Sequence, residues 1–123
     1  MSIALLSLNV MLVMFFLAGV DKILHFNKVV TGFINRVPST PVWLASICIT
    51  VAIIIEIVCP VMINYGFVNK NKDVYLIGCA SLMVFTILAT LIYHFPPVGF
   101  RYYPFMSNLT TVGGLMLAST IFD

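Results

Sequence analysis

The stretch TPVWLASICITVAIIIEIVCPVMINYGF, residues 40–67, decides the fold, because it is long and apolar enough to cross a bilayer and yet contains a glutamate. A helix crosses the hydrocarbon core with about 20 apolar residues. The glutamate, Glu56, lies deep within the run, where a carboxylate costs roughly 2.5–3.5 kcal/mol on insertion scales. Such side chains usually face a protein interior, so the stretch predicts a membrane helix that packs against other helices.

Pro60 follows Glu56 by four residues, so its ring meets the carbonyl group of Glu56 and its missing N–H leaves that carbonyl without a partner. We therefore expect a bend between these two residues. Burial disfavours the charged carboxylate, and we expect no basic residue at this depth, so Glu56 is predicted to be buried and protonated at neutral pH. It is a candidate buried polar or proton-carrying site. The alternative is a structural kink that hydrogen bonds from neighbouring helices hold in place.

The composition indicates a polytopic membrane protein. Hydrophobic residues make up 62% of the 123 residues and charged residues 8%, whereas soluble domains have roughly 45–50% and about 25%. We expect one transmembrane domain over residues 1–123. The net charge of +2 is too small to indicate nucleic-acid binding. The three cysteines lie in apolar runs and are expected to be reduced: Cys48, Cys59 and Cys79.

Four apolar segments have the length of a membrane span, and they predict an all-α four-helix bundle. We place them near residues 3–26, 41–65, 74–95 and 104–122. Thr40–Pro41 and Asp73 are the predicted starts of the second and third helices, and Pro96–Pro97 the predicted end of the third.

The linker between the first two spans, residues 27–40, has a helical pattern of its own. Apolar residues recur at helical spacing and oppose polar ones: Val29, Val30, Phe33, Ile34 and Val37 against Lys28, Asn35 and Arg36. This pattern predicts a short helix that lies in the membrane interface. An irregular loop is the alternative.

Three polar residues lie at the same predicted end of the helices and are candidate ligand-binding residues: Lys22, His94 and Asn108. We expect them to converge around one cavity, because unpaired polar groups in hydrocarbon cost several kcal/mol. Phe26 and Phe95 are expected to form an apolar wall beside them. Glu56 lies about 14 residues from that end, roughly 20 Å deep. We therefore expect two polar layers rather than a Lys22–Glu56 pair.

Other interpretations remain open for the same residues. Lys22 has the position of a lysine that extends its ammonium group to the interface, and the small and hydroxyl residues of the helices have a packing role as their alternative to a ligand or proton path. His25 and His94 are the two histidines that haem ligation would use. Asp21, His25 and His94 are a metal-site alternative. We predict no metal site and do not expect haem.

Several motifs together resemble the DoxX family of small four-helix membrane proteins. FFLAGVDKILHF, residues 15–26, has glycine and lysine three residues apart, at Gly19 and Lys22. FMSNLTTVGGLMLA, residues 105–118, has an asparagine before a glycine pair. Glu56 after a proline-led helix start and His94 near a proline are further similarities. Asp21 and the long linker have no counterpart in this resemblance.

The resemblance implies a four-helix bundle and a quinone or redox partner, as in the membrane subunit of a thiosulfate:quinone oxidoreductase. We expect a small, mainly structural subunit of a larger respiratory or quinone-linked complex, with other membrane subunits and lipids as partners and quinone as the possible cofactor. It is not expected to be catalytic alone. The expected location is an energy-transducing membrane, either the mitochondrial inner or a prokaryotic plasma membrane. The alternatives are a self-standing quinone-interacting redox protein, or a small transporter with Glu56 as its ion or proton site.

Overall fold

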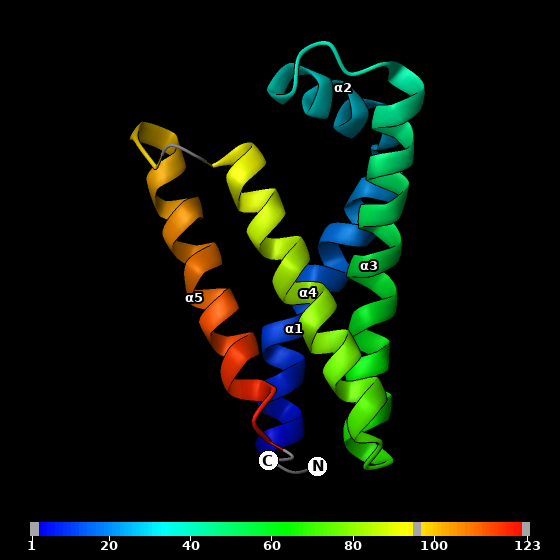
Figure 1. The fold of residues 1–123 in the computed structure, drawn as a ribbon, viewed down its shortest axis with the longest axis vertical. Helices are drawn as coiled ribbons and strands as arrows, with labels where there is room; N and C mark the ends of the chain where they lie inside the picture. Colours follow the sequence, from blue (N-terminus) through cyan, green and yellow to red (C-terminus); the bar gives the residue numbers. More distant parts are fainter. Residues whose placement is uncertain (1–2, 95–96, 122–123) are drawn as a thin grey trace.

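The computed structural model of the chain describes residues 3–94 and 97–121, and the regular elements in these ranges are helices (Figure 1). Its elements are α1 (Ile3–Leu24), α2 (Phe26–Arg36), α3 (Val42–Val68), α4 (Lys72–Tyr93), the short 3-10 helix η1 (Gly99–Arg101) and α5 (Tyr102–Ala118). No strand occurs in these two ranges. The predicted all-α class is confirmed. The beginning of α1 and the end of α5 lie at the same end of the molecule (Figure 1).

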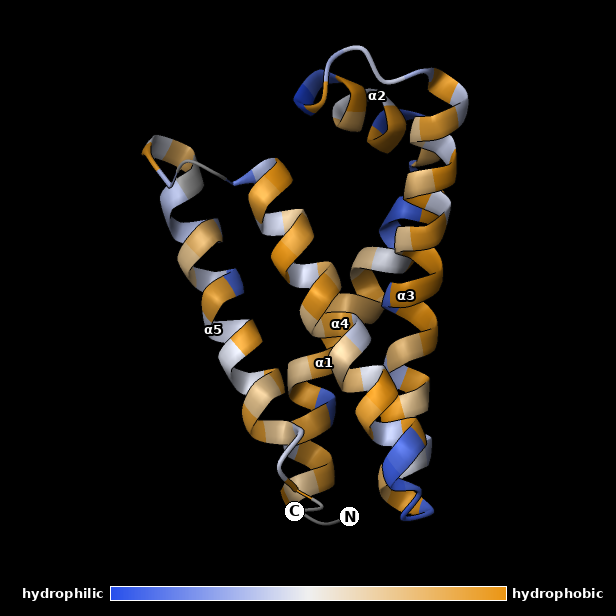
Figure 2. Ribbon diagram, viewed as in Figure 1, coloured by the Kyte–Doolittle hydropathy of each residue, from blue (hydrophilic) through white to orange (hydrophobic). Residues whose placement is uncertain are grey.

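Three helices, α1, α3 and α4, are long and apolar enough to cross a membrane. Figure 2 shows that apolar residues cover most of their length, while polar residues gather at the α3–α4 turn and around α2. The fourth predicted span, 104–122, is shorter than expected, because α5 ends at Ala118 after 17 residues. The hydroxyl groups of Ser119 and Thr120 donate to the carbonyl groups of Met116 and Leu117, which occupies two carbonyls of the last turn. Residue 122 lies outside the described residues.

Two predicted helix starts are corrected. Helix α3 begins at Val42 with Pro41 as its N-cap, and the Thr40 hydroxyl donates to the carbonyl of Val37 instead of capping α3. Helix α4 is capped by Asn71, whose side chain accepts from the Val74 amide at 3.3 Å, so Asp73 lies within the first turn. Asn71 reaches this amide because it lies one turn before it, which is the geometry of an N-cap.

The linker helix forms as α2 over residues 26–36 and lies across the end of the molecule (Figure 1). Its apolar face is the predicted one: Val30 is buried against Ala45 and Ile49 of α3, and Phe33 packs beside it. The 3.6-residue period therefore predicted this helix correctly. Its position at a membrane interface stays a prediction.

Helices α3 and α4 are in close contact at one end and diverge toward α2 (Figure 1). A Cβ atom on Gly66 would lie 2.6 Å from the backbone nitrogen of Tyr75, and one on Gly78 would lie 2.8 Å from Cγ1 of Ile63. The main core lies at this closed end and also includes Leu12 and Leu115. The Tyr75 hydroxyl donates to the Ala118 carbonyl at 2.5 Å, which ties α4 to the end of α5.

Helix α3 remains helical through Pro60, which is buried within it. The Asn64 side chain donates to the Pro60 carbonyl at 2.9 Å. The bend expected between Glu56 and Pro60 stays a prediction.

Candidate functional site

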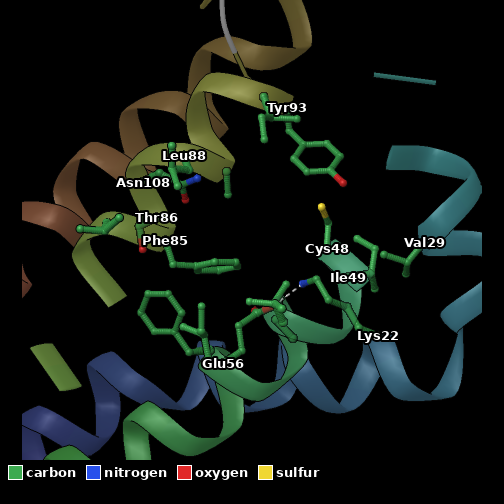
Figure 3. Close-up of a pocket in the computed structure, with 18 of the residues that line it drawn as sticks. Lys22, Val29, Cys48, Ile49, Glu56, Phe85, Thr86, Leu88, Tyr93 and Asn108 are labelled. Carbon is green, nitrogen blue, oxygen red and sulfur yellow. Dashed lines mark ion pairs between the residues drawn. The ribbon is translucent and has the colours of Figure 1, made fainter. Parts of the chain in front are cut away.

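The divergence of the helices leaves a cavity of about 1110 Å³ below α2, lined by residues of all five α-helices (Figure 3). Most lining side chains are apolar. Ligand sites usually measure about 300–1,000 Å³ and combine an apolar lining with a few placed polar groups. This cavity is thus slightly larger than that range and has room for a small lipophilic molecule.

Lys22 and Glu56 form an ion pair across the α1–α3 contact, with Nζ 2.6 Å from Oε1 (Figure 3). Glu56 is 3% exposed, which confirms its predicted burial. The pair contradicts the expectation of two separate polar layers. A protonated Glu56 was expected because no basic residue was expected at its depth. Lys22 does lie at that depth, so this reason no longer holds. Oε1 of Glu56 is buried, and the ammonium group of Lys22 is the partner that it meets.

The depth estimate failed because it assumed that α1 and α3 end at the same level. A Cβ atom on Gly19 would lie 3.3 Å from Cβ of Glu56, so these two residues are level. Lys22 is one turn farther along α1, and long side chains on a helix extend back toward its N-terminus. Its ammonium group therefore returns to the level of Glu56. The first turns of α3 extend beyond α1 and pack against α2 instead.

Asn108 lies on the α4–α5 wall of the cavity. Its Nδ2 donates to Oγ1 of Thr90 at 2.9 Å, and Thr90 donates to the carbonyl of Thr86 at 2.6 Å. Both threonines are buried. The amide of Asn108 has a second N–H and an acceptor oxygen beyond this bond. The arrangement holds one polar group at a defined place in an otherwise apolar wall.

His94 is the C-cap of α4, and its amide donates to the Thr90 carbonyl at 2.9 Å. Its ring lies 6.4 Å from that of Tyr93. The structure thus places Lys22, His94 and Asn108 on the wall of the same cavity. Their role in binding a ligand stays a prediction.

The aromatic wall differs from the expected one. Phe26 packs in the α2–α3 cluster and does not line the cavity, and Phe95 lies outside the described residues. Four other rings line it: Phe15, Phe33, Phe85 and Tyr93. Figure 3 shows Phe85 extending from α4 into the cavity, and Tyr93 and Cys48 pointing into it from α4 and α3. The helical period alone did not single out these rings, because it gives a residue's face but not the divergence of the helices.

His25 contacts Asp21 of the preceding turn, with Nδ1 3.2 Å from Oδ1, and both side chains are more than half exposed. His25 does not line the cavity that His94 lines. Over residues 3–94 and 97–121, no three His, Cys, Asp or Glu side chains gather in a group that could hold a metal ion. The cysteines are free, with Cys59 and Cys79 buried and Cys48 exposed.

Comparison with known protein families gives a match to the DoxX family over residues 5–95. The match includes Lys22, Glu56 and His94 but ends before α5, so the similarity seen at Asn108 and the glycine pair lies outside it. No curated protein matches the chain, and no solved structure matches it.

Proposed function

Because this chain belongs to the DoxX family, and is an integral membrane protein, we propose that it binds an amphipathic ligand of the quinone class in the cavity below α2. We propose further that it does so as a subunit of a larger redox complex in an energy-transducing membrane, either the mitochondrial inner or a prokaryotic plasma membrane. The observation that carries the proposal is the cavity itself, since Lys22 of α1 and Asn108 of α5 contribute polar groups to the lining of a largely apolar space.

The donors suit the head group of a quinone. A quinone has two carbonyl oxygens on opposite sides of a flat ring, and when bound it supplies two-electron redox chemistry. The ammonium group of Lys22 and the second amide N–H of Asn108 are hydrogen-bond donors, and such donors beside an apolar wall fix the orientation of a carbonyl ligand. Phe85 and the other aromatic residues provide surfaces on which a flat ring packs.

Glu56 acts through Lys22 in this proposal. A lysine beside a membrane cavity would otherwise extend its ammonium group toward the interface. The buried carboxylate at 2.6 Å holds that group at the cavity wall. Glu56 is therefore a positioning residue for the cation that faces the ligand.

The subunit role rests on the outer surface of the chain. Helix α5 buries two residues within the described chain, Leu115 and Ala118. Several of its other apolar side chains, including Met106, Leu109 and Leu117, are at least 40% exposed. Lipids or a helix of another subunit cover such a surface in a membrane. We propose α5, with η1 before it, as the fourth span of a four-helix bundle and α2 as an interfacial helix.

The test is purification of the full chain from its native membrane in a mild detergent, followed by solvent extraction and mass spectrometry. Co-extracted quinone in near-equal amount to the chain, with redox subunits in the same native complex, is the expected result. Lys22→Met and Asn108→Leu should reduce the retained quinone, while Lys28→Met, an exposed control, should not. A chain that purifies without quinone and binds none when quinone is added would refute the proposal.

A second candidate, a small proton or ion transporter, is favoured by one observation: Glu56 is buried and also lines the cavity. Flux in proteoliposomes made without quinone separates the two functions. A proton flux that Glu56→Gln abolishes would favour transport over quinone binding.

A further inference from the structure

The end of α2 is attached to the end of α4 above the cavity. Nε of Arg36 donates to the Ile92 carbonyl at 3.2 Å, and the rings of Phe33 and Tyr93 meet edge to face with centroids 6.5 Å apart. The last carbonyls of a helix lack partners within it, and a cation there also meets the negative end of the helix dipole. These contacts connect α2 to α4 at the end of the molecule where α3 and α4 are farthest apart (Figure 1).

Below this bridge, the cavity reaches the outer surface between α3 and α4. Four apolar residues both line the cavity and are about half exposed: Ile47 at 52%, Val51 at 48%, Val84 at 58% and Leu88 at 55%. On α3, the exposed Ile54 lies next to Val51 on the helix surface and does not line the cavity. The four residues therefore form the rim at which the cavity meets the surface that faces lipid, and the rim is apolar throughout.

The residues of α1 and α5 that line the cavity include polar groups. Met14, Asp21 and Thr111 are among them. Asp21 has an exposed carboxyl group, and Thr111 adds a hydroxyl. An alkyl chain that leaves the cavity past these residues would lie beside polar groups, whereas the rim of α3 and α4 offers it methyl groups alone.

We propose that the ligand enters the cavity sideways from the bilayer, between α3 and α4 and below α2, and that its apolar tail remains in this gap. This inference rests on the proposed function and adds to it the chemical class of the ligand. The ligand is a polar ring that carries a long alkyl or isoprenoid chain, not a water-soluble head group. The rim residues Val51, Val84 and Leu88 are then tail-binding residues.

The test compares two ligands and two variants of the full chain in lipid nanodiscs. The ligands are a benzoquinone with a decyl chain and the same ring without the chain. Val84→Trp fills the proposed gap. Val13→Trp is the control, because Val13 on α1 is also about half exposed, at 50%, and does not line the cavity. Both positions are exposed enough to accept a larger side chain, and far-UV circular dichroism checks that each variant is folded.

We expect Val84→Trp to weaken binding of the decyl quinone about tenfold, which is the loss of roughly two buried methylene groups. Binding of the ring without the chain should change less than about twofold, since no methylene contact is lost. Val13→Trp should leave both affinities within about twofold, because Val13 does not line the cavity. The reverse pattern, or an equal loss for both ligands, would overturn the lateral route.

A second measurement does not depend on a change in affinity. Trp43 is the one tryptophan of the chain, so Trp43→Phe combined with Val84→Trp gives a single fluorophore at the rim. A decyl quinone brominated at the chain end should quench this fluorophore more strongly than it quenches the tryptophan of the matching Trp43→Phe/Val13→Trp variant. Equal quenching would overturn the inference. If the wild type binds neither ligand, the proposed function fails as well. If it binds both with equal affinity, the tail-binding gap alone is refuted.

Discussion

Lys22→Met should destabilise the protein strongly, because it leaves the carboxylate of Glu56 buried without its partner. Breaking a buried ion pair from one side costs about 3–5 kcal/mol. The Lys22 side chain is 23% exposed and that of Glu56 is 4% exposed, so we expect the lower end of that range, about 3 kcal/mol. Glu56→Gln leaves Lys22, the more exposed partner, without its carboxylate. Because the flexible side chain of Lys22 can extend its ammonium group to the interface, this variant should lose only about 1 kcal/mol of stability.

The double variant Lys22→Met/Glu56→Gln removes both charges and should cost about 2 kcal/mol, less than the sum of the single changes. The resulting coupling energy is about 2 kcal/mol, well above the roughly 0.5 kcal/mol seen for independent sites. Unfolding by a denaturing detergent in mixed micelles, followed by far-UV circular dichroism, gives the four free energies. Lys28→Met is the matched control and should stay within about 0.5 kcal/mol, because Lys28 is exposed.

Additive effects of Lys22→Met and Glu56→Gln would refute this reasoning, since the two side chains would then not form a pair in the folded protein. So would a Lys22→Met variant no less stable than Lys28→Met. Either result would restore the expectation of a protonated Glu56 apart from Lys22.

Other substitutions test the packing of the closed end. Gly66→Ala should lower the free energy of unfolding by more than about 2 kcal/mol, because the added Cβ would lie 2.6 Å from the Tyr75 backbone. Gly113→Ala is the control and should be neutral or slightly stabilising, because its Cβ would have nothing within 4 Å. Thermal unfolding in detergent compares the two variants. Tyr75→Phe removes the hydrogen bond to the Ala118 carbonyl and should cost about 1 kcal/mol, with faster hydrogen exchange at the end of α5 as its specific signature. Pro60→Ala should straighten α3, which spin labels at its two ends would report as a longer distance; an unchanged distance would contradict the expected bend.

The sequence by itself determined the helices and the identity of the polar residues. Apolar length predicted α1, α3 and α4, and the 3.6-residue period predicted α2 with its buried Val30. These features depend on neighbours along the chain, so a pattern in the sequence carries them. The burial of Glu56 is of the same kind, since a carboxylate within an apolar span faces protein rather than lipid. The ends of α3, α4 and α5 were less certain, because caps such as Asn71 depend on which of several polar residues reaches the amide.

Only the tertiary structure decided how far each helix is shifted along its neighbour and where the helices separate. The close approach at Gly19 places Glu56 of α3 level with Gly19 of α1. Lys22, one turn farther along α1, can therefore reach Glu56. The contacts at Gly66 and Gly78 close one end of the α3–α4 pair, while Arg36 spans the open end and the cavity lies between. A hydrophobic period repeats every turn, so it assigns each residue to a face but is the same for any shift of the helix along its axis. Contacts between residues far apart in the chain fix that shift, and with it the cavity.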